Sequence, residues 1–149
     1  MSRYIEKENR NQIAMKPLCL DDMIGEENHV RTIEMIVESM NIAELGFAYS
    51  EPKAIGRKPY NPVDMFKLYL YSYFNGIRSS RKIEQECRRN IEVMWLIGEL
   101  KPNQKTIAKF RKENKAAIKE AFQRFTMMYN EMNLINRYHR KINWSLSKV

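Results

Sequence analysis

One apolar stretch constrains the fold of this chain more than any other feature of its sequence. Asn61-Pro62 begins it with a favourable helix N-cap and a proline, which loses no needed hydrogen bond at the first helical position. Apolar residues then cover most of the helix surface, and Gly76 supplies a left-handed stop. The apolar part, Val63 to Phe74, is too short to span a bilayer, which takes about 20 residues. We therefore predict a central, buried helix around which the other helices pack.

The polar residues of this predicted helix are few. Asp64 falls in its first turn, where the helix dipole favours a negative charge. Lys67, Ser72 and Asn75, with the hydroxyl of Tyr71, complete a narrow polar stripe. A helix with so little polar surface is expected to be the most buried element of the protein.

The composition of the chain favours helices over strands. The 149 residues suit one domain, and 44% of them are apolar, which is enough for a substantial core. Only five glycines and five prolines are present, so few turns are available and long helices are favoured. The predicted fold class is all-α, a compact multi-helix domain with no β-sheet.

The cysteines and histidines form no pattern typical of a metal or cofactor site. Cys19 and Cys87 are the only cysteines, and no secretion signal is found in the polar N-terminal segment. They are interpreted as free thiols in a reducing cytoplasm. His29 and His139 are far apart and no cluster of ligands accompanies them. We accordingly expect no cofactor, no metal site, no membrane partner and a cytoplasmic location.

Charge is distributed unevenly along the chain. Residues 1–52 hold five Lys/Arg and ten Asp/Glu, whereas residues 101–149 hold twelve Lys/Arg and three Asp/Glu. The net charge of the whole chain is +8. This asymmetry indicates an anionic partner, most often nucleic acid, although the solvated lysines of any soluble basic protein would give the same pattern.

Further helices are predicted from apolar spacing and from capping residues. They cover residues 28–41, 81–89, 91–97, 103–114 and 115–133. On the first of these, Glu34 and Glu38 fall mostly on the outer side and are interpreted as a solvated face. On the second, Cys87 faces inward and is interpreted as a small core residue rather than a nucleophile.

Residues 91–114 have the pattern of a helix-turn-helix. A short apolar helix ends at Gly98, and after a tight turn Asn103 caps a second helix, on which Ile107 and Phe110 lie on one side. The opposite side carries a stripe of lysines, namely Lys105, Lys109 and Lys112. The second helix of a helix-turn-helix enters the major groove of DNA. The alternative is a lysine stripe that serves only solubility.

The chain is divided into three parts, and the last of them departs from this helical pattern. Residues 1–17 are interpreted as a polar arm, residues 18–135 as the helical domain and residues 136–149 as a basic tail. Basic and aromatic residues of the tail could contact a nucleic-acid backbone and stack on bases. A tail without regular structure is the interpretation that we favour.

Several short motifs occur together between residues 18 and 135. They are Gly-Arg-x-Pro-Tyr-x-Pro, Gly-x-Arg-Ser-Ser-Arg with a following Glu, Trp-Leu-x-Gly, and Pro-x-x-x-Thr with a following Phe-Arg. In this order they closely resemble the N-terminal domain of bacterial insertion-sequence transposases of the DDE type. The matching residues are Gly56, Arg57, Pro59, Tyr60, Pro62, Gly76, Arg78, Ser79, Ser80, Arg81, Glu84, Trp95, Leu96, Gly98, Pro102, Thr106, Phe110 and Arg111.

The resemblance implies that an RNase H-like nuclease would follow, in which three acidic residues bind two divalent metals for strand cleavage and joining. Here the sequence leaves the family pattern at Leu134-Ile135, and its only aspartates are Asp21, Asp22 and Asp64. We therefore expect this chain alone to be non-catalytic, a transposase truncated before its nuclease core.

The function that the resemblance implies is DNA binding in a bacterial cytoplasm, in association with the nucleoid. The expected partners are double-stranded DNA at the element's terminal inverted repeats, and a second copy or the full-length transposase. Candidate DNA-contacting residues are Arg57, Lys58, Arg78, Arg81, Lys82, Lys105, Lys109, Arg111 and Lys112. Most would bind phosphates. The planar side chain of Arg111 would either read a guanine or have a structural role.

Two other functions fit the same sequence. A protein-interaction module would pair transposase subunits through its apolar surfaces, and its lysines would then only be solvated. A stand-alone regulator would occupy the ends of the element and block the full enzyme.

Overall fold

Helices account for all the regular structure that is described in this protein. The computed structural model describes residues 10–11, 19–48 and 56–146, with side chains described as far as residue 133. These ranges contain six α-helices, two short 3-10 helices and no strand, so the predicted all-α class is confirmed. In chain order the elements are η1 (Asp21–Met23), α1 (His29–Ser39), η2 (Ile42–Leu45), α2 (Pro62–Phe74), α3 (Ser80–Arg89), α4 (Ile91–Ile97), α5 (Gln104–Glu113) and α6 (Lys115–Leu146).

The helices begin at the asparagines that the sequence marks as N-caps. The side-chain oxygen of Asn61 accepts a hydrogen bond of 2.9 Å from the Val63 amide, and Pro62 is the first residue of α2. Asn28 and Asn103 cap α1 and α5 in the same manner. Each cap satisfies an amide that its helix leaves unpaired, which is why these starts could be predicted.

The end of α2 is closed by the predicted glycine. Gly76 has a left-handed conformation with a φ of 68°. The Ile77 amide donates to the Ser72 carbonyl at 2.8 Å, and the Gly76 amide donates to the Tyr73 carbonyl at 3.2 Å. Together these bonds form a Schellman motif, which pairs carbonyl groups at the end of the helix.

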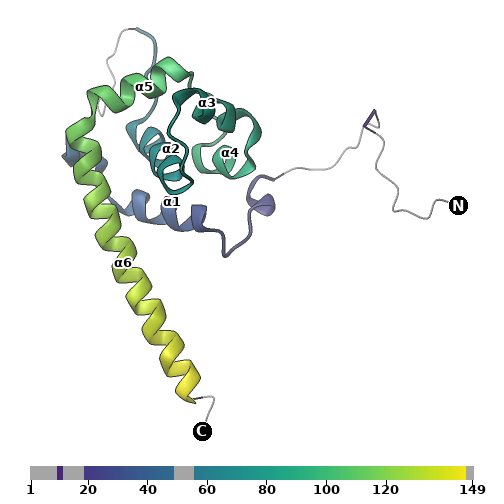
Figure 1. Cartoon of the computed structure of the whole chain (residues 1–149), viewed down its shortest axis with the longest axis vertical. Helices are drawn as coiled ribbons and strands as arrows, with labels where there is room; N and C mark the ends of the chain where they lie inside the picture. Colours follow the sequence, from purple (N-terminus) through teal and green to yellow (C-terminus); the bar gives the residue numbers. More distant parts are fainter. Residues whose placement is uncertain (1–9, 12–18, 49–55, 147–149) are drawn as a thin grey trace, which may run out of the picture.

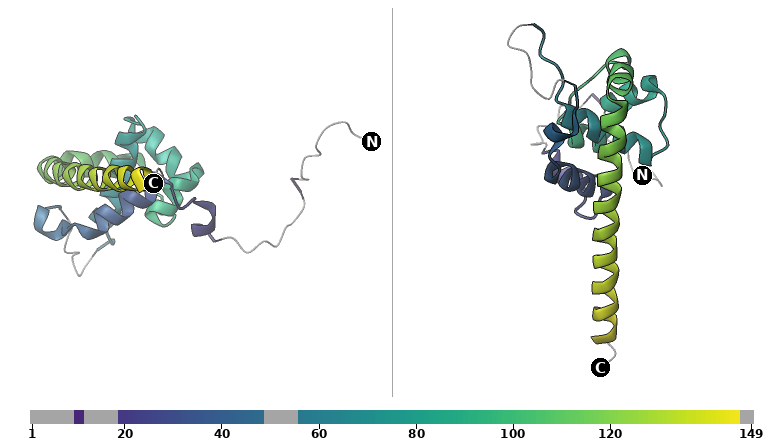
Figure 2. Two further views of the ribbon diagram at one scale, coloured as in Figure 1. Left: turned by 90° about the horizontal axis from the view of Figure 1, so that it is seen from below. Right: turned by 90° about the vertical axis from the view of Figure 1, so that its left-hand side faces the viewer.

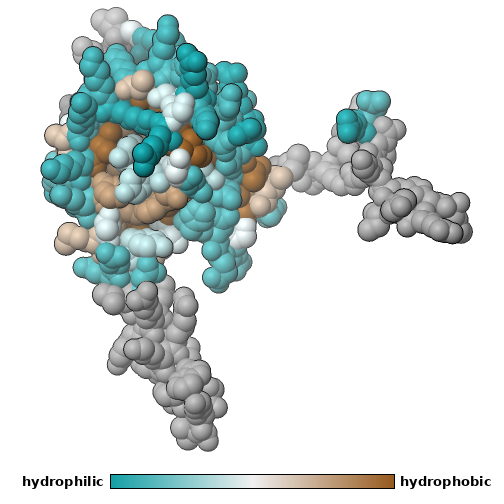
Figure 3. Space-filling model, viewed as in Figure 1, coloured by the Kyte–Doolittle hydropathy of each residue, from teal (hydrophilic) through white to brown (hydrophobic). Residues whose placement is uncertain are grey.

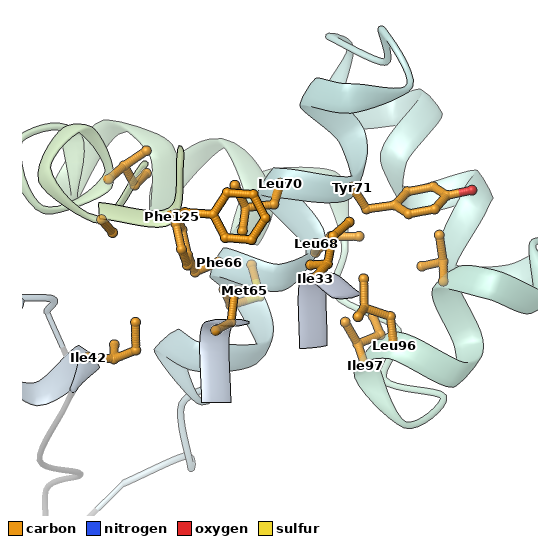
Figure 4. Packing of buried hydrophobic residues seen from close by; sticks show 14 of the residues in the cluster. Ile33, Ile42, Met65, Phe66, Leu68, Leu70, Tyr71, Leu96, Ile97 and Phe125 are labelled. Carbon is orange, nitrogen blue, oxygen red and sulfur yellow. The ribbon is translucent and has the colours of Figure 1, made fainter. Parts of the chain in front are cut away.

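Helix α2 lies at the centre of the hydrophobic core. Its Phe66 and Leu70 are 0% exposed, and the helix packs most extensively against α1 and α4. Phe125 of α6, also fully buried, lies beside Phe66 and Leu70 (Figure 4). Ile33 of α1 and Leu96 of α4 pack around another part of α2 in the same view. The prediction of a central buried helix is therefore confirmed.

Two residues of the polar stripe of α2 are buried. Lys67 and Ser72 are 3% and 2% exposed. The Lys67 Nζ atom lies 2.5 Å from a Glu38 carboxylate oxygen and 3.4 Å from a Glu34 carboxylate oxygen. The Ser72 hydroxyl donates to the Leu68 carbonyl at 2.7 Å. The Glu34 and Glu38 side chains are 37% and 59% exposed, as their interpretation as a solvated face predicts, but they also neutralise a cation that the packing of α1 on α2 encloses.

The last turn of α2 is less buried than expected. Tyr73 and Phe74 are 57% and 46% exposed. Their rings contact α6, with Tyr73 4.8 Å from Phe122 and Phe74 6.3 Å from Tyr129, measured between ring centroids. Figure 3 shows apolar residues near the middle of one face, surrounded by hydrophilic ones. The apolar surface of α2 is therefore covered by the core in its middle but only partly at this end.

Helix α6 is longer than its predicted end at Asn133. Its backbone stays helical to Leu146, so it includes most of the segment interpreted as a tail without regular structure. The sequence has no glycine or proline after Pro102 to stop it. At 1.5 Å per residue its 32 residues span roughly 48 Å, and its second half extends away from the other helices (Figures 1 and 2). No described helix is long and apolar enough to cross a membrane.

Asp21 joins three elements at the edge of the core. Its carboxylate accepts hydrogen bonds of 2.9 Å from the Trp95 indole of α4 and from Arg31 of α1. The Arg31 guanidinium also lies over the Trp95 ring, 5.0 Å from its centroid. The hydrogen bond from Trp95, followed by that from Arg31, lowers the pKa of Asp21. The cluster of Asp21, Arg31 and Trp95 thereby fastens η1 to α1 and α4.

Candidate nucleic-acid interface

Helix α5 has the two-sided character that its sequence predicts. Ile107 is 3% exposed and faces the core. Phe110 is half-buried, and its ring stacks on Phe47 with 5.9 Å between centroids. The lysine stripe of Lys105, Lys109 and Lys112 is exposed on the other side. Lys109 lies 3.7 Å from the Glu113 carboxylate, so part of the stripe's charge is balanced within the helix.

A pocket with several cations in its wall lies beside α5. Its volume is about 340 Å³, and it lies between α5 and the segment that leads into α2. Arg57 and Lys58 line it from that segment, and Lys101 and Lys109 line it from the α5 side. Lys101 was not among the predicted contacts, because its nearness to Arg57 comes from the tertiary fold. Its position two residues before the Asn103 cap was the only available signal in the sequence.

Helices α3 and α5 are fastened together at two points. The Glu84 carboxylate of α3 accepts a hydrogen bond of 3.2 Å from the amide of Gln104, the first residue of α5. Farther along α5, the Arg111 guanidinium donates to the carbonyl of Arg78, just before α3, at 2.7 Å. The two helices therefore run in opposite directions. Among the described elements α3 is the main packing partner of α5, whereas the helix-turn-helix pattern pairs α5 with α4.

The nine predicted contact residues fall into two groups around this pair of helices. Arg57 and Lys58 lie beside the lysine stripe of α5. Arg81 and Lys82 are exposed on α3, and Arg81 Nε donates to the Gln104 side chain at 3.0 Å. Arg78 is exposed and precedes α3. Arg111 is half-buried on α5 and lies between the two groups, where it donates to the Arg78 carbonyl. For Arg111, this contact corresponds to the structural alternative stated from the sequence.

Comparison with protein-family models identifies the family to which this sequence belongs. The model of the transposase domain (DUF772) matches residues 18–113, which include η1 and run to the last residue of α5. The chain belongs to the DUF772 transposase domain family. The comparison with curated proteins and the comparison with solved structures each found no match. The family supports a role connected with transposition, as the sequence motifs imply.

Several motif residues of the DUF772 domain have structural roles. Glu84 and Arg111 form the joint between α3 and α5, and Gly98 closes α4 in a left-handed conformation. Phe110 packs on Phe47. A motif match therefore does not by itself mark a residue as a DNA contact in this domain.

The remaining reactive groups of the DUF772 domain are held in structural positions. Cys87 is 0% exposed, and burial raises the pKa of its thiol to about 11, so it stays protonated at neutral pH. This agrees with its interpretation as a core residue. His29 stacks on the Tyr71 ring at 6.2 Å. Within the described residues no group of three or more His, Cys, Asp or Glu could hold a metal ion.

Proposed function

We propose that this domain binds double-stranded DNA at the terminal inverted repeats of its mobile element, as the non-catalytic N-terminal domain of a DDE-type transposase. The observation that carries the proposal is the exposed lysine stripe on α5. Ile107 and Phe110 hold the opposite side of this helix to the core, so the stripe is presented on a fixed support. Membership of a transposase domain family supports DNA as the polyanion.

Cations from other parts of the chain enlarge this basic surface. Arg57, Lys58 and Lys101 lie at the pocket beside α5, and Arg78, Arg81 and Lys82 lie on or before α3. A lysine ammonium group acts as a point charge suited to phosphate oxygens. Such contacts supply affinity and fix the orientation of the protein, but they carry no sequence information.

The proposal is tested by measuring the affinity of the chain for a mixed-sequence duplex at several salt concentrations. The variant Lys105→Ala/Lys112→Ala removes two cations from the stripe. If both contact phosphates, affinity falls and the slope of log affinity against log salt flattens by about two units, because each phosphate contact contributes about one unit. Lys119→Ala/Arg124→Ala removes two exposed cations from α6 and is the matched control.

The control variant is expected to bind as the parent does. The proposal is overturned if the α5 variant, folded by circular dichroism, keeps the parent affinity and salt slope. Recognition of the element's ends is tested separately, by competition between a terminal inverted-repeat duplex and a scrambled duplex of the same composition. If the two duplexes compete equally, the proposed recognition of terminal inverted repeats is wrong.

A protein-interaction module is a second candidate function, favoured by exposed apolar side chains. Tyr73 and Phe74 at the end of α2 and Met127 on α6 are exposed, Met127 by 65%. Surfaces of this kind occur where proteins associate. Sedimentation of the chain over a range of concentrations tests it, since subunit pairing gives a concentration-dependent mass with little effect of salt.

A further inference from the structure

Helix α3 presents a second polar surface that differs in chemistry from that of α5. Its buried residues are Ile83 and Cys87. Its exposed residues recur at helical spacing on the other side and are Arg81, Lys82, Gln85, Arg88 and Arg89. None of these exposed residues is acidic. The exposed face of α3 therefore carries a net positive charge together with planar guanidinium and amide groups.

The exposed residues of α5 lack such planar groups. They are Lys105, Ala108, Lys109, Lys112 and Glu113. A lysine is a compact charge that binds phosphate well but distinguishes bases poorly, whereas Arg and Gln form paired hydrogen bonds with guanine and adenine edges in the major groove. Of the two helices, α3 thus has the side chains suited to reading a base sequence.

The acidic residues of α3 are engaged by neighbouring groups and do not stand free on this surface. Glu84 accepts from the Gln104 amide at 3.2 Å and lies 3.3 Å from Arg88. Glu86 pairs with Arg89 and accepts a hydrogen bond of 2.7 Å from Asn90. These contacts place negative charge against fixed partners, which reduces its repulsion of a nearby phosphate backbone.

The side chains that would read bases are accessible, and the two arginines among them contact neighbouring residues. Arg81 is oriented through its Nε by Gln104, and the Arg88 side chain is 64% exposed although it touches Glu84. Gln85 lies between them in sequence and is exposed. Together with Glu84 and Gln104, these residues line a hollow of about 310 Å³ between α3 and α5.

We propose that α3, rather than α5, is the helix that reads base edges, with Gln85 and Arg88 as its specificity-determining residues. This inference rests on the proposed DNA binding. At 1.5 Å per residue the ten residues of α3 span roughly 15 Å, and the major groove admits one α-helix. The α5 lysines, fixed to α3 by the Glu84–Gln104 and Arg111–Arg78 contacts, then lie on the flanking phosphates.

The test is selection by the full chain from a pool of duplexes with a randomised core, followed by sequencing of the bound fraction. The parent is expected to enrich a motif. Gln85→Ala and Arg88→Ala are each expected to lose the preference at one or two positions of that motif, by on the order of 10-fold. Arg88→Lys keeps the charge but not the planar group, and is expected to lose the same preference.

The α5 variant Lys105→Ala/Lys112→Ala is the comparison. It is expected to enrich the parent's motif while binding all duplexes more weakly. The inference alone is overturned if Gln85→Ala and Arg88→Ala, both folded by circular dichroism, enrich the parent's motif unchanged. It is also overturned if the parent binds duplex DNA but enriches no motif. Failure of the parent to bind any duplex, even at low salt, overturns the proposed function as well.

Discussion

The ammonium group of Lys67 depends on two carboxylates from another helix. It is enclosed between α1 and α2, beside Glu34 and Glu38. Replacing both with Gln removes the two ion-pair partners of a buried charge, which is expected to destabilise the fold by up to about 3 kcal/mol, since these part-exposed carboxylates are already partly solvated. Lys67→Met removes the charge but keeps the bulk of the side chain, and is expected to change stability by no more than about 1 kcal/mol.

Urea unfolding followed by circular dichroism compares these two variants. The order of the two effects is the informative result. If Lys67→Met were the more damaging variant, the stability of the α1–α2 contact would come from the ion pairs themselves rather than from the need to neutralise an enclosed cation.

Asp21 is expected to link stability to acidic pH. Its pKa is lowered from 3.8 in the folded protein by the Trp95 and Arg31 hydrogen bonds. A carboxyl group with a lowered folded pKa contributes stability above its unfolded pKa, and this contribution is lost as the pH falls through the folded pKa. Asp21→Asn should therefore lower the thermal midpoint at pH 7, with a smaller difference from the parent near pH 3. If Asp21→Asn lowered the thermal midpoint equally at pH 7 and near pH 3, the ionised carboxylate of Asp21 would not be the source of the stability.

At single residues, sequence reasoning succeeded where one helix determines the environment. The 3.6-residue period alone places Ile107 opposite the α5 lysines, and the structure confirms this. The sequence alone did not indicate that Lys67 is buried, because the burial of a lysine depends on carboxylates from a helix about 30 residues earlier. For Arg111 the sequence left two roles open, and only the tertiary fold brings its guanidinium to the Arg78 carbonyl.

Among the helices, α2 offers the sharpest test of a terminating residue. Gly76 has a φ of 68° and no atom within 4 Å of the position that a Cβ would take. Gly76→Ala is therefore expected to cost about 1 kcal/mol through backbone strain rather than a clash. Gly25→Ala is the matched control, because Gly25 also has open space but no left-handed φ. Chemical denaturation of both variants tests this prediction. An equal loss of stability in Gly76→Ala and Gly25→Ala would show that the left-handed conformation of Gly76 causes no strain.

The helices could be located from sequence more reliably than their partners could. Local capping by Asn28, Asn61 and Asn103 determines where three of them begin. The end of α6 was misplaced because its apolar spacing weakens after Asn133 while no helix-breaking residue follows. The pairing of α5 with α3 was also missed. Adjacency in the chain suggested α4, whereas the hydrogen bond from Gln104 to Glu84 spans 20 residues.

For the whole molecule, the sequence showed acidic and basic parts but could not show how they meet. Several acidic residues of the segment 19–48 contact basic or aromatic residues of other elements rather than forming a separate acidic surface. Glu34 and Glu38 neutralise Lys67, and Asp21 holds Arg31 and Trp95. The candidate interface is likewise a product of the fold, since Arg57 and Lys101 line the same pocket although they are far apart in the chain.

The enclosure of Lys67 gives the protein a built-in chemical reporter. Every other described lysine is exposed, so an amine-reactive reagent reaches those side chains in the native state. Lys67 becomes accessible only when α1 separates from α2. In a mass spectrum of a digested sample, acylation of this one peptide would therefore count opening events of the core, while the surface lysines supply the internal standard for reagent activity.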